Sequence, residues 1–257
     1  MTTKIAVAGS KGRMGQLITD EIGRFDDLEL VAGFDVRGVG DPLGRGVAVS
    51  DASELAEVLQ RSGAQVLIDF TTPSATVENV RVAADLGVDL VVGTTGFSED
   101  QKEKMARSIE GRAAAVISPN YSQGVNLFWR LIEVAARSLQ GYDIEVVEAH
   151  HRNKMDAPSG TAAEAVRILK RATGKSEAVY GRVGQGLRGE EIGVHAVRAG
   201  DIIGDHTVLF AGPGERLEIR HQAHSRQAFA SGAVRAARWV AGAPCGIYAM
   251  ADVLGQR

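Results

Sequence analysis

Residues 148–162 place groups that could move protons beside groups that could bind an anion. They read Glu-Ala-His-His-Arg-Asn-Lys-Met-Asp-Ala-Pro-Ser-Gly-Thr-Ala, with two imidazoles, a guanidinium and an ammonium close together. A strand-like run, 142–147, precedes them, and a helix is expected to start near Ser159. Ser159 can cap that helix, and the backbone N–H groups of Gly160 and Thr161 at the expected helix start, with the helix dipole, favour a bound anion. The segment therefore predicts a pocket for a small carboxylate beside proton-transferring groups.

A solvated charged surface is the alternative interpretation of the same residues. The small residues at 157–161 argue against it, because they allow close approach of a backbone and point a helix N-terminus at the charges. Histidine transfers protons readily near neutral pH, which makes His150 a candidate general acid or base. The ammonium of Lys154 could both bind a carboxylate and donate a proton.

The N-terminal residues form a second candidate site. The strand-like run Lys4–Ala8 leads into Gly-Ser-Lys-Gly-Arg-Met-Gly at 9–15, and an amphipathic helical pattern follows. This context is the one that a dinucleotide-binding turn requires, although the spacing is Gly-x-x-Gly-x-x-Gly rather than Gly-x-Gly-x-x-Gly. Gly9 would make the tight turn, Gly12 would admit a pyrophosphate, and Gly15 would let the helix lie close to the sheet. A strand-to-helix turn without a nucleotide is the alternative.

Asp35 follows the second expected strand, 28–34, and lies twenty residues after Gly15. A carboxylate at this position can accept hydrogen bonds from both hydroxyls of the adenosine ribose, although an ordinary strand-end aspartate would look the same. Its charge favours NADH over NADPH. Lys11, Arg13 and Arg37 are cations that could reach a 2′ phosphate and offset this effect, so we expect use of both cofactors with a moderate preference for NADH.

Strands and helices alternate through the rest of the N-terminal half. Apolar runs at 66–70, 88–92 and 113–117 alternate with helical patterns at 53–61, 74–86 and 99–109. This order predicts a parallel sheet with helices on both faces. Three small, polar loops leave the strands at the edge where such sheets bind ligands, although any one of them could be ordinary turn chemistry. Their candidate cofactor-binding residues are Phe70, Thr71, Gly93, Thr94, Thr95, Ser118, Pro119, Asn120 and Tyr121.

The C-terminal half has a different pattern. An apolar helix at 125–139 precedes the strand at 142–147, a helix at 161–173 and a glycine-rich connection, and three strand-like runs follow at 192–198, 202–210 and 216–223. This order predicts an α+β domain with an open mixed sheet, which we expect to pack against other copies of the chain. The expected fold class is α/β, a Rossmann-type domain plus this second domain. The expected bounds are 1–122 with 229–257 returning to it, and 123–228.

Composition limits the possible partners. The chain has 257 residues, enough for one large or two modest domains, with 44% hydrophobic and 24% charged residues. Its 29 basic and 32 acidic residues give a net charge of −3, which offers no electrostatic case for nucleic acid or an anionic membrane. Cys245 is the only cysteine, so an intrachain disulfide and a cysteine metal site are excluded. We expect small-molecule partners, no metal, no signal segment, no membrane span and a cytoplasmic location.

Four motifs together resemble those of the 4-hydroxy-tetrahydrodipicolinate reductase (dihydrodipicolinate reductase) family of bacterial lysine and diaminopimelate synthesis. They are the segments 9–15, 93–97 (Gly-Thr-Thr-Gly-Phe), 120–126 (Asn-Tyr-Ser-Gln-Gly-Val-Asn) and 148–162. The likeness covers essentially the whole chain, and the segment 148–162 is much more specific than the glycine turn. The resemblance implies an NADH- or NADPH-dependent oxidoreductase that makes tetrahydrodipicolinate.

The resemblance also implies roles for individual residues. It makes His150 the general acid/base and Lys154 a proton donor, and it implies a homotetramer whose domains close over cofactor and substrate. Asn153 departs from the family pattern, where many members have histidine, and Thr72 stands where some have arginine near the cofactor. The implied substrate-binding residues are His151, Lys154, Ser159, Gly160 and Thr161. The implied cofactor-binding residues are Gly9, Ser10, Lys11, Gly12, Arg13, Met14, Asp35, Arg37 and the loop residues named above.

Two other functions stay open on the residues alone. One is a different two-domain reductase, such as an amino-acid or sugar dehydrogenase. Lys154 and the segment 159–161 favour a dicarboxylate over a polyol. The other is a redox-sensing, nucleotide-binding regulator, which would need a nucleic-acid or partner surface that the balanced charge does not indicate.

Overall fold

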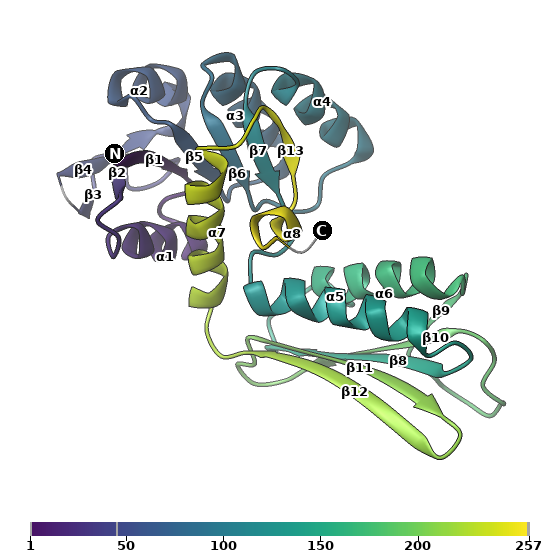
Figure 1. Cartoon of the computed structure of the whole chain (residues 1–257). Coiled ribbons are helices and arrows are strands. Elements are labelled where there is room, and N and C mark those ends of the chain that lie inside the picture. The colour runs from purple at the N-terminus through teal and green to yellow at the C-terminus, as the bar shows by residue number, and fades with distance from the viewer. Residues whose placement is uncertain (1, 45, 256–257) are drawn as a thin grey trace. The chain divides into compact units, whose positions relative to one another are not determined.

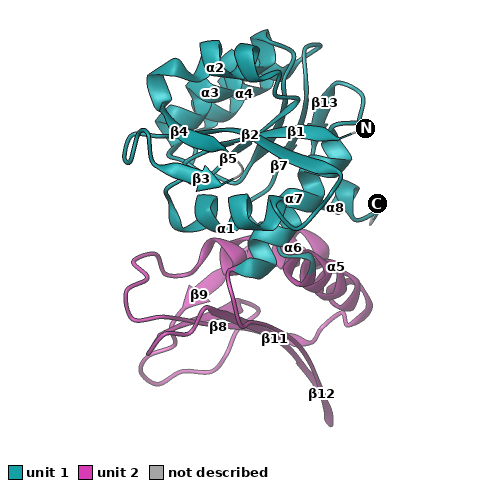
Figure 2. Cartoon of the chain, turned by 90° about the vertical axis from the view of Figure 1, so that its left-hand side faces the viewer, with its two compact units in different colours: residues 1–123, 227–257 teal, residues 124–226 magenta. Residues whose placement is uncertain are grey.

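The protein divides into two compact units (Figure 2). The computed structural model describes residues 2–44 and 46–255. Unit 1 contains residues 1–123 and 227–257, and unit 2 contains residues 124–226. The chain thus leaves unit 1 once and returns to it.

Unit 1 is built around a sheet with strand order β13-β7-β6-β5-β1-β2-β4-β3. All neighbours pair in parallel except β3 and β4, which are antiparallel. Its strands are β1 (Thr3–Ala8), β2 (Leu28–Asp35), β3 (Pro42–Gly44), β4 (Val47–Asp51), β5 (Val66–Asp69), β6 (Asp89–Val92), β7 (Ala114–Ile117) and β13 (Gly246–Tyr248). Its helices are α1 (Arg13–Ile22), the short 3-10 helix Ala52–Glu54, α2 (Leu55–Ser62), α3 (Pro73–Asp85), α4 (Glu99–Ile109), α7 (Gln227–Val240) and α8 (Met250–Val253).

Helices cover both faces of this sheet because its central strands are apolar on both sides. In β1, Ile5 and Val7 pack with α1 and α7, whereas Ala6 and Ala8 pack with α2, α3 and α4. Figure 1 shows the two helical layers. The parallel sheet with helices on both faces is confirmed. Residues 227–257, with helix α7, belong to unit 1.

Unit 2 has a mixed sheet with the order β12-β11-β8-β10-β9. β8 pairs with β10 in parallel and with β11 in antiparallel orientation. The elements are α5 (Gln123–Ser138, beginning at the last residue of unit 1), β8 (Asp143–His150), α6 (Gly160–Thr173), β9 (Ala178–Tyr180), β10 (Ile192–Arg198), β11 (Gly204–Gly212) and β12 (Glu215–Ala223). The predicted α+β fold with an open mixed sheet is confirmed.

The two faces of the unit 2 sheet differ. Alternate residues of β8, starting with Ile144 and Val146, are buried against α5 and α6, and the same row continues into Glu148 and His150. A strand therefore delivers two polar side chains to the helix-covered face. Figure 1 shows both helices on this one face. Within the described part of unit 2, the opposite face has no helix on it.

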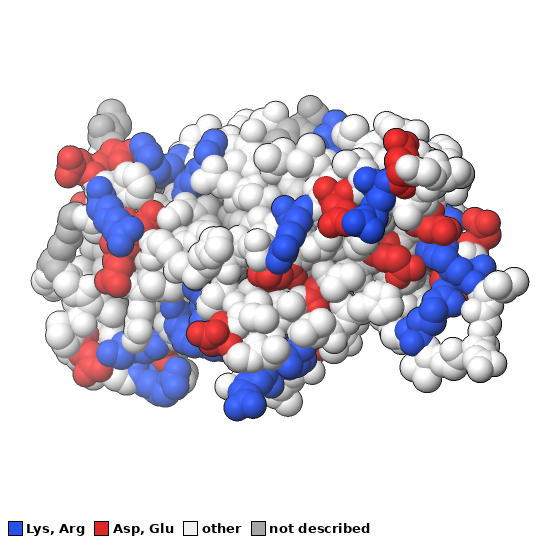
Figure 3. Space-filling model, turned by 90° about the horizontal axis from the view of Figure 1, so that it is seen from below, with Lys and Arg blue, Asp and Glu red and all other residues white. Residues whose placement is uncertain are grey.

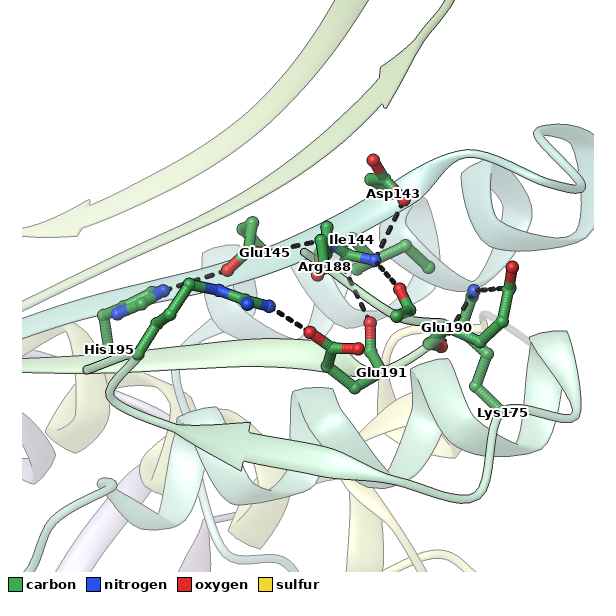
Figure 4. A network of polar contacts seen from close by, with 10 residues as sticks. Asp143, Ile144, Glu145, Lys175, Arg188, Glu190, Glu191 and His195 are labelled. Atoms are coloured by element: carbon green, nitrogen blue, oxygen red, sulfur yellow. Dashed lines mark hydrogen bonds and ion pairs between the residues drawn. The ribbon is translucent and has the colours of Figure 1, made fainter. Parts of the chain in front are cut away.

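Arg188 fastens the connection between β9 and β10 to the sheet (Figure 4). Its Nη1 donates to Asp143 Oδ1 at 2.9 Å, its Nε to Glu145 Oε1 at 3.3 Å, and its Nη2 to the Ile144 and Glu191 carbonyls at 3.1 and 2.7 Å. One guanidinium thus ties an irregular segment to the first half of β8.

Several elements were not predicted from the sequence. The strands β3, β4, β9 and β13 and the helix α8 fall in segments that the sequence analysis left unassigned. β13 extends the unit 1 sheet beside β7, so the C-terminal segment contributes a strand as well as a helix. No helix in the described ranges is long and apolar enough to cross a membrane.

Candidate active site

The glycine turn between β1 and α1 has the close contacts that its glycines permit. Gly9 has φ +77°, and a Cβ there would lie 2.6 Å from the Phe70 carbonyl oxygen. A Cβ on Gly15 would lie 2.1 Å from the Gly9 carbonyl oxygen, and one on Gly12 would lie 3.0 Å from the same atom. The turn is therefore tight and brings its backbone beside the loop after β5. A close-packed glycine turn before a helix is the cradle that a pyrophosphate needs.

Asp35 ends β2 next to this turn and is buried. Its Oδ2 accepts the Lys11 backbone N–H at 3.0 Å, and its Oδ1 accepts the Arg37 backbone N–H at 3.1 Å. A carboxylate has about four lone-pair sites, so both oxygens keep capacity for the two ribose hydroxyls. The Arg37 side chain is exposed, with Nε 3.8 Å from Oδ1. The Lys11 ammonium pairs with Asp41 Oδ2 at 2.8 Å.

A cleft of about 280 Å³ opens beside the turn and Asp35. Of the predicted cofactor residues, the cleft is lined by Gly9, Gly12, Asp35, Arg37, Phe70 and Thr71. It is also lined by residues that the sequence analysis did not assign to the cofactor, namely Ala8, Phe34, Val36, Ala52, Leu55, Thr72, Ala75 and Asn79. Most of these are small or apolar, and they lie in β1, β2, the 3-10 helix, α2 and α3 or in the loops beside them, where the sequence shows no ligand-binding motif.

Two of the predicted loops are joined by a buried aspartate. Asp69 ends β5 with no exposed surface, and its Oδ1 accepts the Thr71 hydroxyl at 2.7 Å and the Thr76 hydroxyl at 2.9 Å. Its Oδ2 accepts the Asn79 amide at 2.7 Å. Thr94 Oγ1 accepts the Thr71 backbone N–H at 3.0 Å, which connects the loop after β5 to the loop after β6. Asp69 therefore fixes the wall of the cleft.

The other predicted cofactor residues lie in or near the same strand ends. Ser10 is buried, and its hydroxyl donates to the Phe34 carbonyl at 3.2 Å. The Tyr121 hydroxyl donates to the Val92 and Val116 carbonyls at 2.9 and 2.8 Å, so its ring belongs to the core. Of the remaining residues, Arg13, Thr95 and Pro119 are exposed, and Met14 and Asn120 are half-buried. Gly93 lies against the Phe70 ring. The Ser118 hydroxyl donates to the Asn120 carbonyl.

In unit 2 a buried carboxylate joins the predicted histidine to the predicted helix start. Glu148 Oε2 lies 2.6 Å from His150 Nδ1, and its Oε1 accepts the Ser159 backbone N–H at 3.0 Å. Arg198 donates to both oxygens at 2.8 Å. Glu148 has no exposed surface. Burial by itself would raise the pKa of Glu148, but the hydrogen bonds from His150, Arg198 and Ser159 outweigh burial and hold that pKa at about 2.

Ser159 caps α6 as predicted. Its hydroxyl accepts the Ala162 N–H at 3.2 Å and lies 3.0 Å from His206 Nε2. Gly160 and Thr161 form the first turn of the helix, so their N–H groups have no carbonyl four residues earlier within the helix. This helix start can receive an anion.

His206 brings a third imidazole to this cluster. Its ring packs against the His150 ring, edge to face, with centroids 5.2 Å apart. Burial lowers the pKa of His206 to about 3, and the charge of His150 adds to the effect. His206 is therefore neutral at physiological pH.

Lys154 lies in the loop that follows β8. Its ammonium is 2.7 Å from Asp156 Oδ1. Its backbone N–H donates to the His151 carbonyl at 3.0 Å, which folds the loop back towards the histidine pair. Burial would raise the pKa of Asp156, but the hydrogen bond and charge of Lys154 lower it overall.

Glu148, Arg198 and His206 have no role predicted from the sequence. One signal was present, because Glu148 stands two residues before His150 on a strand, and this spacing puts both on one face. Arg198 and His206 are far away in sequence and become neighbours through sheet register. Arg198 pairs with His150, and His206 pairs with Glu148. In the described parts of the chain, no group of His, Cys, Asp and Glu is placed to hold a metal ion.

The Rossmann-type sheet, the glycine turn and the acidic end of β2 define a dinucleotide-dependent oxidoreductase. The family model for the N-terminus of dihydrodipicolinate reductase matches residues 3–121, and the model for its C-terminus matches residues 124–254. The chain belongs to the dihydrodipicolinate reductase family.

Similar proteins and structures agree with this membership. The chain is 54% identical to a 4-hydroxy-tetrahydrodipicolinate reductase of Methanosarcina barkeri and 48% identical to that of Methanocaldococcus jannaschii, with at least 97% of each chain covered. A dipicolinate-bound dihydrodipicolinate reductase from Paenisporosarcina has 27% identity and a TM-score of 0.81, with 97% of this chain and 98% of that chain covered. A diaminopimelate dehydrogenase of Corynebacterium glutamicum, at 15% identity and a TM-score of 0.58 over 97% and 93% of the two chains, shares the fold.

Proposed function

We propose that this chain reduces 4-hydroxy-tetrahydrodipicolinate to tetrahydrodipicolinate with NADH or NADPH, in diaminopimelate and lysine biosynthesis. The ring carbon gains a hydride, the product gains a proton, and the ring hydroxyl leaves as water. Unit 1 would hold the dinucleotide and unit 2 the dicarboxylate. The alternative of an amino-acid or sugar dehydrogenase has support only from shared fold.

The observation that carries the proposal is the joining of two features by Glu148. The same carboxylate binds His150 Nδ1 and the Ser159 N–H, so a proton-transferring side chain and a helix start suited to an anion are held together. A cyclic dicarboxylate needs both kinds of group. The segment that contains them is also the most specific of the motifs described above.

Unit 1 has the features that a dinucleotide requires. The turn at Gly9 and Gly12 would hold the pyrophosphate, and Asp35 would accept hydrogen bonds from the ribose hydroxyls. Thr71 and Thr94, fixed by Asp69, would line the cleft further along the cofactor. When bound, the reduced nicotinamide supplies the hydride to an electron-poor carbon.

Unit 2 would bind the substrate and supply protons. His150 presents Nε2 to the substrate, because Nδ1 is held by Glu148. Lys154 would bind a carboxylate through its ammonium and donate a proton from Nζ. His151 and the start of α6, Ser159–Thr161, would bind the remaining carboxylate oxygens.

We also propose a homotetramer assembled through the unit 2 sheet, 192–223. Support comes from exposed apolar side chains on the same unit. Leu187 is 100% and Val183 95% exposed in the connection that Arg188 fastens to the sheet, and Val197 of β10 is 44% exposed. Exposed apolar side chains on and beside a sheet with an uncovered face favour association.

The distribution of charge fits a reductase of small molecules. On the face that Figure 3 shows, basic and acidic side chains are mixed. Such mixing gives little attraction for a polyanion. A cytoplasmic location stays a prediction.

A coupled assay tests the proposed activity. Pyruvate and aspartate semialdehyde are supplied with the preceding synthase, and oxidation of NADH or NADPH is followed by absorbance. We expect cofactor oxidation that depends on both substrates and both enzymes. A flat trace with a synthase shown to be active would contradict the proposal.

Variants test the proposed roles. His150→Gln and Lys154→Ala should each lower kcat by roughly 10²- to 10⁴-fold, the usual range for a positioned acid or base, while dinucleotide binding persists. Lys154→Ala should also raise KM for the dicarboxylate. His224→Gln is the matched control, since His224 is exposed after β12. Near-normal turnover of both site variants would mean that the cluster is a solvated charged surface without a catalytic role.

A further inference from the structure

We propose that Glu148, clamped by Arg198, is a positioning residue that fixes the tautomer and orientation of His150 and ties them to the start of α6. The inference deepens the proposed function and rests on it, because it assigns to Glu148 the orientation of the group that transfers the proton. Replacing Glu148 should therefore affect proton transfer, which replacing a carboxylate with a purely structural role would not do.

The first argument is geometric. The Glu148 Oε2 to His150 Nδ1 distance of 2.6 Å is short for a hydrogen bond and fits a charge-assisted contact. Because an ionised carboxylate only accepts, Nδ1 must carry the proton, and Nε2 is left to exchange protons with a substrate. A carboxylate that orients an imidazole through its other nitrogen is a recurrent device in catalytic and metal sites.

The second argument is the way Glu148 is itself held. Its two oxygens receive two guanidinium hydrogen bonds from Arg198 at 2.8 Å, and Oε1 also receives the Ser159 N–H. Arg198 Nη2 donates further to the Asp156 carbonyl at 2.5 Å. Four donors on a fully buried carboxylate, counting His150, leave it little freedom to rotate. The bidentate fork also fixes its plane.

The third argument is the space around the other imidazole nitrogen. A Cβ on Gly204 would lie 3.0 Å from His150 Nε2, so the absence of a side chain there leaves this atom room. His206 lies on the neighbouring side and is neutral, so it does not compete with Arg198 for Glu148. Of the charged groups in this region, Glu148 contacts the His150 ring, Arg198 contacts Glu148, and Lys154 and Asp156 pair with each other in the loop after β8.

A second Glu, His and Arg group on β8 provides a contrast. Glu145 binds His195 Nε2 at 2.9 Å and Arg188 Nε at 3.3 Å (Figure 4). Glu145 lies on the opposite face of the sheet from Glu148, is partly exposed, and meets Arg188 with one nitrogen rather than two. The two groups share residue types, and only that of Glu148 is buried and bidentate.

The test uses the full-length protein with Glu148→Gln. An amide has one accepting oxygen, so it cannot serve His150, Arg198 and Ser159 together. We expect kcat to fall by about 10²-fold, with KM for the dinucleotide changed less than about twofold. The pH dependence of kcat should also change, because the imidazole loses the charged partner that orients it.

The control is Glu164→Gln on α6. Glu164 also forms a bidentate pair with an arginine, Arg167, at 2.8 and 2.5 Å, without a histidine. Its kcat and pH profile should match those of the wild type. Glu148→Asp, which keeps the charge but withdraws it by one methylene, should give an intermediate kcat. It also provides the comparison if Glu148→Gln does not fold.

Each outcome decides one question. A wild-type protein without cofactor oxidation would overturn the proposed function. A wild type that turns over, together with Glu148 variants of unchanged kcat and pH profile, would overturn the positioning role alone. A loss of kcat with an unchanged pH profile and a proportionate loss in Glu164→Gln would also overturn it, since that pattern follows from general destabilisation.

Discussion

Discrimination between the two cofactors should be set at Asp35 and adjusted by Asp41. The Asp35 carboxylate can bind the free 2′ hydroxyl of NADH, and its charge repels the 2′ phosphate of NADPH. Lys11 is a partly buried cation beside the glycine turn, but its ammonium already pairs with Asp41 at 2.8 Å. The structure therefore predicts a moderate NADH preference, because one of the cations that could offset Asp35 is engaged elsewhere.

Two substitutions separate these effects. Exposed ion pairs contribute up to about 1 kcal/mol, and about 1.4 kcal/mol corresponds to a tenfold ratio. Asp41→Ala should release Lys11 and lower the NADH to NADPH ratio of kcat/KM by roughly fivefold or less. Asp35→Ala removes both attraction for the hydroxyl and repulsion of the phosphate, so it should lower the ratio by roughly tenfold.

Steady-state kinetics with both cofactors at fixed ionic strength measure these ratios. Asp85→Ala removes another exposed carboxylate paired with arginine, on α3, and should leave the ratio unchanged. The Asp41→Ala effect should shrink in high salt, since exposed charges are screened. An unchanged ratio in Asp35→Ala would refute contact between Asp35 and the ribose. A rise in the ratio in Asp41→Ala would refute the competition for Lys11.

Further predictions concern assembly, stability and access to the proton-transferring nitrogen. Light scattering at micromolar concentration should give four times the subunit mass, and a single subunit mass would exclude assembly through 192–223. Asp69→Asn should lower the unfolding free energy by roughly 2 kcal/mol or more and raise KM for the cofactor, measured by denaturant melts and kinetics, since a buried charged acceptor loses its hydrogen bonds. Gly204→Ala should lower kcat by roughly 10- to 10²-fold by crowding His150, and unchanged kcat would show that the added methyl group is tolerated. Acid should destabilise the fold over two ranges of pH. The stabilisation from Glu148 is complete above its ordinary pKa of 4.5 and is lost towards a pKa of about 2, and that from His206 is complete above its ordinary pKa of 6.5 and is lost towards a pKa of about 3. Thermal melts between pH 7 and 3 should show a falling Tm, with a smaller fall in His206→Phe.

The main elements of the fold could be predicted because they have strong local patterns. The strand at β1 is continuous and apolar, and α1 follows with apolar residues at helical spacing. The strands β3, β9 and β13 have three residues each, which is too few for a period to show. They exist because longer neighbouring strands offer free edges, and this depends on tertiary contact.

The candidate site was predictable only where its residues are close together in sequence. His150 and Ser159 lie in one motif, so their types and spacing point to their chemistry. The partnership of Glu148 with Arg198 depends on the parallel register of β8 and β10, which no local pattern reveals. Asp69 likewise looks like an ordinary strand end, and its role depends on Thr76 and Thr94 folding over it.

The return of the chain to unit 1 has a consequence for how the protein is made. Helix α7 supplies Ala233, Val234 and Ala237 to the core that also contains β1 and β5. A Cβ on Gly232 would lie 1.8 Å from the Tyr121 carbonyl oxygen, so α7 packs directly on the segment where the chain first departs. At roughly 5–20 residues per second, the ribosome delivers α7 about 5 to 20 s after residue 123. During that interval one face of the nascent unit 1 sheet lacks its cover, and at its end unit 2 has its complete sequence before α7 is made. Translation therefore favours maturation of the inserted unit before the unit that begins the chain.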